Sequence, residues 1–125
     1  MNENDIGDMI IDTAVTMHIE LGPGLFESVY EAILFDQLSK KGLIVKRQVP
    51  VPIVFDGKLF DEGFRLDLLV EEKVIVELKS IEKIAPVHKK QLITYLRLSN
   101  KKLGYILNFR AEVMKDGITR IVNKL

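Results

Sequence analysis

The stretch Arg65–Ser80, RLDLLVEEKVIVELKS, decides the fold of this chain. Two largely apolar runs flank the acidic pair Glu71-Glu72, a pattern typical of two antiparallel strands joined by a tight turn. The second run, Val74–Leu78, carries apolar side chains on both of its faces, which is typical of a central strand covered on both sides. We therefore expect this hairpin at the centre of a sheet that helices cover.

Patterns on either side of the hairpin predict the rest of the fold. We expect helices over 5–21, 25–41 and 86–98, strands over 43–55, 59–70, 73–80 and 103–109, and a short strand or helix over 117–122. A helix between the third and fourth strands makes those two strands parallel. The predicted fold class is α/β (α+β), with a mixed four-stranded sheet flanked by helices. In this sheet a three-strand antiparallel meander is followed by a crossover helix and a parallel fourth strand, in a single domain of residues 1–125.

Composition narrows the class of protein. With 47% hydrophobic and 29% charged residues the chain is typical of a soluble globular protein, and the absence of cysteine excludes disulfides and thiolate metal sites. No apolar run approaches the roughly 20 residues that span a bilayer, and the acidic start MNENDIGD is unlike a signal peptide. We therefore expect a cytoplasmic protein without membrane contact.

Charge is unevenly distributed along a chain whose net charge is zero. The zero balance argues against an obligate nucleic-acid binder. Residues 1–36 contain no Lys or Arg, whereas residues 79–102 are strongly basic. Two interpretations stay open here, namely a local site for a polyanion and two solvated helix faces.

Three charges interrupt the apolar hairpin. Glu77 and Lys79 are two residues apart on one strand and project from the same face, and a favourable register brings Asp67 beside them. Two adjacent carboxylates repel each other, and Mg²⁺ bound by their oxygens removes that repulsion. A lysine beside such an ion can hold a water molecule or stabilise a phosphodiester under attack. The alternative is a structural ion pair of Lys79 with both carboxylates, and these three residues alone leave both interpretations open.

Three motifs together resemble a known family. Asp67 followed by Glu77-Leu78-Lys79 resembles the Asp…(Asp/Glu)-x-Lys signature of the PD-(D/E)XK nuclease superfamily. Gly24–Tyr30, GLFESVY, fits the GxxExxY signature of the family of that name within the superfamily, and Gln91–Tyr95, QLITY, resembles the QxxxY motif of RecB-like nucleases. The resemblance covers roughly residues 10–122. It implies a restriction-endonuclease-like core of helix, three-stranded meander, helix and strand.

The resemblance also implies roles for individual residues. The implied catalytic residues are Glu27, Asp67, Glu77, Lys79 and Gln91, and the implied metal ligands are Asp67, Glu77, the Leu78 carbonyl and Glu27. The implied ion is Mg²⁺, for which Mn²⁺ can substitute. The expected contacts to nucleic acid are Tyr95, Lys89, Lys90 and His88. Each has a structural alternative: Glu27 can favour its helix dipole, Tyr95 can be a core residue, His88 a structural residue, and the lysines solvated. One departure is Leu66, which stands where the superfamily name has proline.

These observations predict a Mg²⁺-dependent nuclease that hydrolyses phosphodiester bonds of nucleic acid, with DNA favoured over RNA. The alternative function is a catalytically inactive nuclease-fold domain that binds nucleic acid or a protein partner. Because 125 residues leave little protein to hold a long substrate, a homodimer or a separate recognition partner is also expected.

Overall fold

The computed structural model describes all residues, 1–125, and every predicted helix and strand is present in it. The elements are α1 (Glu3–Leu21), α2 (Glu27–Lys40), β1 (Val45–Phe55), β2 (Lys58–Val70), β3 (Val74–Lys79), α3 (Pro86–Ser99), β4 (Leu103–Asn108), the 3₁₀ helix η1 (Met114–Gly117) and β5 (Ile118–Val122). Their boundaries differ from the predicted ones by at most two residues. The local hydrophobic periods were therefore sufficient to locate the elements.

All strands join one sheet in the order β1-β2-β3-β4-β5. The pairs β1/β2, β2/β3 and β4/β5 are antiparallel, and β3/β4 is parallel, as the crossover through α3 requires. The prediction of four strands was wrong, because Ile118–Val122 forms a fifth strand that pairs along β4. All six residues of β4 are buried, and a buried strand must have hydrogen-bonding neighbours on both of its edges. The sequence pattern of Ile118–Val122 alone could not show that this segment pairs with β4.

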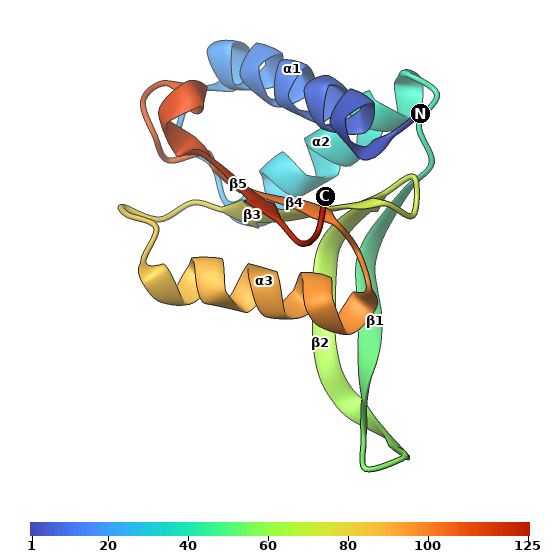
Figure 1. Cartoon of the computed structure of the whole chain (residues 1–125). Coiled ribbons are helices and arrows are strands. Elements are labelled where there is room, and N and C mark those ends of the chain that lie inside the picture. Colours follow the sequence, from blue (N-terminus) through green and yellow to red (C-terminus); the bar gives the residue numbers. More distant parts are fainter.

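Helices cover both faces of the sheet, as Figure 1 shows, with α1 and α2 on one side and α3 on the other. The larger core cluster lies under α1 and α2 and includes Ile10, Tyr30, Leu34, Val76 and Tyr105. The smaller cluster lies under α3 and consists of Leu66, Leu69, Ile75, Leu92, Leu96 and Ile106. The strand order places β3 in the middle of the sheet, and its residues enter both clusters, which confirms that it is a central strand covered on both faces.

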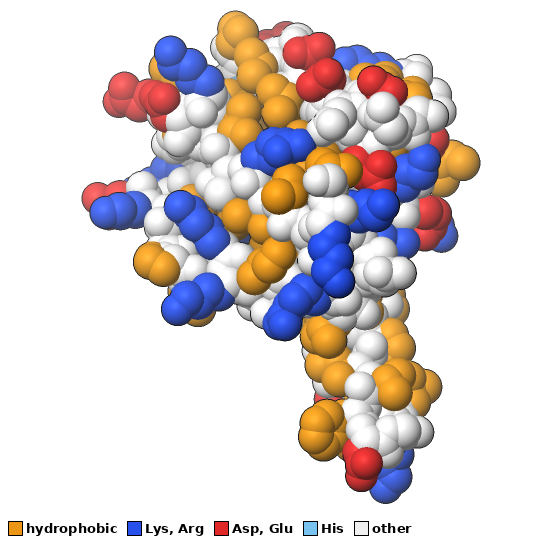
Figure 2. Space-filling view, viewed as in Figure 1, with side chains coloured by type: hydrophobic (Ala, Val, Ile, Leu, Met, Phe, Trp, Pro, Cys, Tyr) orange, Lys and Arg blue, Asp and Glu red, His pale blue; other side chains and the backbone are white.

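The β1–β2 hairpin extends well beyond the layers of the body (Figure 1). Figure 2 shows hydrophobic side chains along this projection. Phe55 and Leu59 of this hairpin are exposed. The strand register shifts between Val51 and Ile53. Gly63 lies at this irregularity, and a Cβ atom there would overlap the Val51 carbonyl oxygen, so only glycine fits.

No helix of the structure combines the length and the apolar character that crossing a bilayer demands.

Candidate active site

Asp67 and Glu77 face each other where the β2–β3 ladder ends. The last paired residues are Leu68 and Val76, and the next residue outward on each strand is one of the two acids. The Asp67 N–H donates to Glu77 Oε2 at 2.9 Å, and the Leu78 N–H donates to Asp67 Oδ2 at 2.9 Å. Because β2 leaves β3 here to form the projecting hairpin, carboxylate oxygens replace backbone carbonyls as acceptors. The two acids are thereby held side by side.

Both carboxyl groups are shifted toward their neutral forms. Burial, followed by the neighbouring charge of Asp67, raises the pKa of Glu77 to about 8. Burial also raises the pKa of Asp67, although the hydrogen bond from Leu78 opposes this shift. Glu77 is only 7% exposed. Two carboxylates in this position therefore repel each other at neutral pH unless a proton or a cation neutralises them.

Lys79 lies near this pair without bonding to it. Its side chain is half-buried, and its positive charge lowers the pKa of both Asp67 and Glu77. The Lys79 ammonium makes no hydrogen bond, and no carboxylate oxygen lies within the 4.0 Å that defines an ion pair. The alternative of a structural ion pair with both acids is therefore wrong. The ammonium remains available to another group.

The donor atoms at this position suit a hard divalent cation. Each carboxylate uses one oxygen to accept a backbone hydrogen bond and keeps the other free of such bonds. Mg²⁺ typically takes one or two carboxylates and completes its shell with water and substrate phosphate. The structure forms no group of three or more His, Cys, Asp or Glu side chains, so Glu27 does not join Asp67 and Glu77. Asp67 and Glu77 are thus the two carboxylates that the structure brings together at this position.

A second glutamate of α2 lies closer to the acidic pair. Glu31 is 6% exposed, and its negative charge raises the pKa of both Asp67 and Glu77. It accepts hydrogen bonds from Arg47 Nε at 3.0 Å and from Gln48 Nε2 at 2.7 Å. Glu27, one helical turn earlier, is exposed and has no hydrogen-bond or ion-pair partner. Sequence reasoning missed Glu31, although its spacing of four from Glu27 places both on one helix face.

Gln48 connects Glu31 to Asp67. Its side-chain amide donates to Glu31, and it lies 3.5 Å from Asp67 Oδ1. Gln48 has φ of 51° within β1, a left-handed conformation that costs a residue with a side chain on the order of 1–3 kcal/mol. Such strain is concentrated at functional sites, where the surrounding structure maintains it. Nothing in the sequence pattern marked this residue.

Helix α3 places Tyr95 near the acidic pair. The Tyr95 ring stacks on Phe64, with 4.1 Å between centroids and 2° between planes. Burial, followed by the charges of Glu77 and Asp67, raises the Tyr95 pKa, so the phenol lies within electrostatic reach of both. Gln91, one turn earlier on α3, is exposed. Tyr95 is thus partly a packing residue, as its structural alternative required.

The basic residues predicted to contact nucleic acid lie on α3. Lys89 and Lys90 are exposed and form no ion pair, and Figure 2 shows Lys and Arg side chains spread over this part of the surface. His88 has a defined structural contact, because its Nδ1 accepts the Ala85 N–H at 2.9 Å and satisfies a donor at the start of α3. Contact of these residues with nucleic acid stays a prediction.

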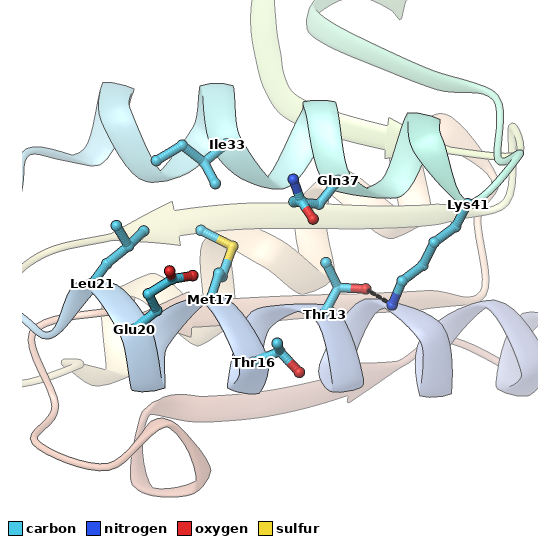
Figure 3. Close-up of a pocket in the computed structure, with 8 residues that line it drawn as sticks. All are labelled: Thr13, Thr16, Met17, Glu20, Leu21, Ile33, Gln37 and Lys41. Atoms are coloured by element: carbon cyan, nitrogen blue, oxygen red, sulfur yellow. Dashed lines mark hydrogen bonds between the residues drawn. The ribbon is translucent and has the colours of Figure 1, made fainter.

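A hollow of about 180 Å³ lies between α1 and α2, away from these residues. Figure 3 shows its lining, with Lys41 reaching from the end of α2 to donate a hydrogen bond to Thr13 of α1. Thr16, Glu20 and Gln37 are the other polar residues of its lining. None of the predicted site residues lines this hollow. It is therefore not part of the candidate site.

A family model described as the PD-(D/E)XK nuclease superfamily matches residues 4–121. The match runs from α1 into β5 and includes every residue of the candidate site. No curated protein and no solved structure gave a significant match.

Proposed function

The chain belongs to the PD-(D/E)XK nuclease superfamily, and on this premise we propose that it is a Mg²⁺-dependent nuclease. It hydrolyses phosphodiester bonds of nucleic acid, DNA in preference to RNA. The observation that carries the proposal is the arrangement of Asp67 and Glu77, held side by side by backbone N–H groups next to an unpaired Lys79. Apolar residues would stabilise a strand end at less electrostatic cost, so the arrangement favours a functional role.

The chain's own residues have distinct tasks in this proposal. Asp67, Glu77 and the Leu78 carbonyl would hold Mg²⁺, which would polarise the phosphate and lower the pKa of a bound water. Lys79 positions the attacking water and stabilises the negative charge that develops on the phosphate. A cation bound between Asp67 and Glu77 would remove the repulsion between them, so that both carboxyl groups would be ionised at neutral pH.

Residues around this centre support it. Gln48 and Glu31 position Asp67 through the hydrogen bonds described above. Glu27 is proposed to support the metal site from the first turn of α2, through water or substrate. Gln91 and Tyr95 are proposed to contact a substrate phosphate from α3, where Lys89, Lys90 and His88 extend the binding surface. Membership of the GxxExxY family, and a homodimer or separate recognition partner, also stay predictions.

Cleavage assays with single- and double-stranded DNA and RNA test the proposal. Wild-type protein should cleave at least one substrate in Mg²⁺ or Mn²⁺ and none in EDTA. Lys79→Ala should lower the rate by about 10²-fold or more, as expected when one transition-state contact is removed. Lys83→Ala is the matched control, because Lys83 is an exposed lysine of the same segment and should leave the rate unchanged.

Two results would contradict the proposal. Equal cleavage by wild type and Lys79→Ala would identify a contaminant or a different site. Binding of nucleic acid without cleavage in either metal would favour a catalytically inactive nuclease-fold domain.

A further inference from the structure

An open hollow of about 360 Å³ lies beside the Lys79 end of β3. Its lining consists of Pro23, Gly24, Leu25 and Phe26 from the α1–α2 connection, Ser80 after β3, and Arg110 after β4. Ligands of open α/β sheets commonly bind outside the carboxyl ends of parallel strands, and β3 and β4 are the parallel pair here. Ser80, which lines the hollow, directly follows Lys79 in the chain.

Phe26 presents an aromatic ring to this hollow without a structural reason. It is 83% exposed, so its ring contributes little to the core. It occupies the N-cap of α2, where Ser, Thr, Asp or Asn stabilise a helix by accepting a backbone hydrogen bond, and Phe26 makes no such bond. A large aromatic side chain that neither packs nor caps is free to stack on a ligand.

Arg110 supplies a free cation in the same lining. It is exposed, and its guanidinium forms no hydrogen bond or ion pair in the structure. A guanidinium has five N–H donors in a planar fork that matches the oxygens of a phosphate group. The hollow therefore combines an aromatic surface with a phosphate-binding group.

The loop that carries Phe26 and the segment that carries Arg110 are both anchored to the same buried aromatic pair, Tyr30 and Phe109. Tyr30 Oη accepts the Leu25 N–H at 3.0 Å, and Ser80 Oγ donates to the Leu25 carbonyl at 3.1 Å, which hold the loop beside Phe26. The Tyr30 ring stacks on Phe109, the residue before Arg110, with 4.4 Å between centroids. Groups held in place before binding lose less conformational entropy when the ligand arrives.

We propose that this hollow binds one nucleotide of a single-stranded segment beside the scissile phosphate. The base stacks on Phe26, and Arg110 contacts the adjoining phosphate. In a duplex the base faces are already stacked on neighbouring pairs, so stacking on Phe26 requires an unpaired base. The inference rests on the proposed nuclease function and adds its substrate class, which is single-stranded or frayed nucleic acid.

Fluorescence anisotropy with a labelled single-stranded DNA of mixed sequence tests this binding. Ca²⁺ replaces Mg²⁺ in the buffer, and a gel checks that the strand stays intact. Phe26→Ala should weaken binding by about tenfold, the effect expected for loss of one base–aromatic stack, and Phe26→Trp should restore it. Phe55→Ala is the matched control, because Phe55 is 72% exposed on the distant hairpin and should leave affinity unchanged.

The salt dependence of binding distinguishes the role of Arg110 from that of Phe26. Arg110→Ala should weaken binding and reduce the slope of log K against log salt by about 0.7, because one phosphate contact is lost. Phe26→Ala should leave that slope unchanged. Neither variant should alter the weaker binding of a blunt duplex, and thermal melting should show that both remain folded.

The outcomes separate this inference from the nuclease proposal. Wild-type affinity of Phe26→Ala or Arg110→Ala for the single strand, or no binding by wild type, would overturn the nucleotide site, even if Mg²⁺-dependent cleavage depends on Lys79. Weaker binding by both variants without any cleavage by wild type would support the nucleotide site and overturn the nuclease function alone.

Discussion

The backbone N–H of Asp67 donates a 2.9 Å hydrogen bond to the carboxylate of Glu77 at the point where β2 and β3 separate. This bond and the one from the Leu78 N–H to Asp67 close the end of the ladder with side-chain oxygens. The carboxylates are therefore part of the sheet's hydrogen bonding and also the acidic centre of the candidate site. Changes to either acid should consequently affect both stability and metal binding.

Stability should fall as pH rises toward 8, because of Glu77. The folded pKa of about 8 exceeds the ordinary value of 4.5, so the native state binds more protons than the unfolded state between these values. The contribution of Glu77 is fully present below about pH 4.5 and is lost as pH rises through about 8, by up to ~1.4 kcal/mol per pH unit. Urea denaturation at about pH 6, 7 and 8 measures it. The free energy of unfolding should fall much less steeply with pH in Glu77→Gln than in the wild type. An equally steep fall would rule out Glu77 as its source.

Mg²⁺ should raise the melting temperature of the wild-type protein, and more at about pH 8 than at about pH 6. A ligand that binds only the folded state stabilises it, and the ion competes with protons for the Asp67 and Glu77 oxygens. Thermal melts with and without Mg²⁺ provide the measurement. Asp67→Asn should abolish the shift, whereas Asp61→Asn, on the exposed part of the hairpin, should retain it. A shift that persists in Asp67→Asn would place the bound ion elsewhere.

Glu31→Ala should reduce the free energy of unfolding by about 1–2 kcal/mol. The substitution removes the buried acceptor of Arg47 and Gln48, and part of the Arg47 charge remains solvated, which limits the loss. Glu27→Ala is the matched control on the same helix face and should change the value by less than about 0.5 kcal/mol. Chemical denaturation compares the two. Equal losses would show that the buried contacts of Glu31 contribute nothing specific.

Tyr30→Phe should destabilise the protein by about 1–2 kcal/mol, because two hydrogen bonds are lost while the ring remains. Tyr30 Oη donates to the Gly22 carbonyl at 2.5 Å and accepts the Leu25 N–H. Tyr105→Phe is the control, since Tyr105 is also a buried tyrosine and its hydroxyl takes no part in the hydrogen bonds that hold this loop. Hydrogen exchange of the Leu25 amide should also quicken in Tyr30→Phe. An unchanged exchange rate would show that the hydroxyl does not hold this loop.

The sequence by itself determined the elements and their order. Periods of two and 3.6 residues are local properties, so a strand such as Val74–Lys79 and a helix such as Pro86–Ser99 were located within two residues. The crossover helix determined in turn that the strands on either side of it are parallel. The motif around Asp67, Glu77 and Lys79 indicated the superfamily only together with the motifs at Gly24–Tyr30 and Gln91–Tyr95, and the family model matches that superfamily.

Only the tertiary structure decided which groups meet. Register depends on contacts between distant residues, and a shift of one residue would have turned Asp67 away from Glu77. The same holds for Glu31 and Gln48, which approach Asp67 from α2 and β1 although no local pattern marks them. The fifth strand and the absence of an ion pair at Lys79 are likewise results of packing. Local sequence patterns indicate where turns occur and which side chains are buried, whereas the distances between side chains depend on how the helices pack on the sheet.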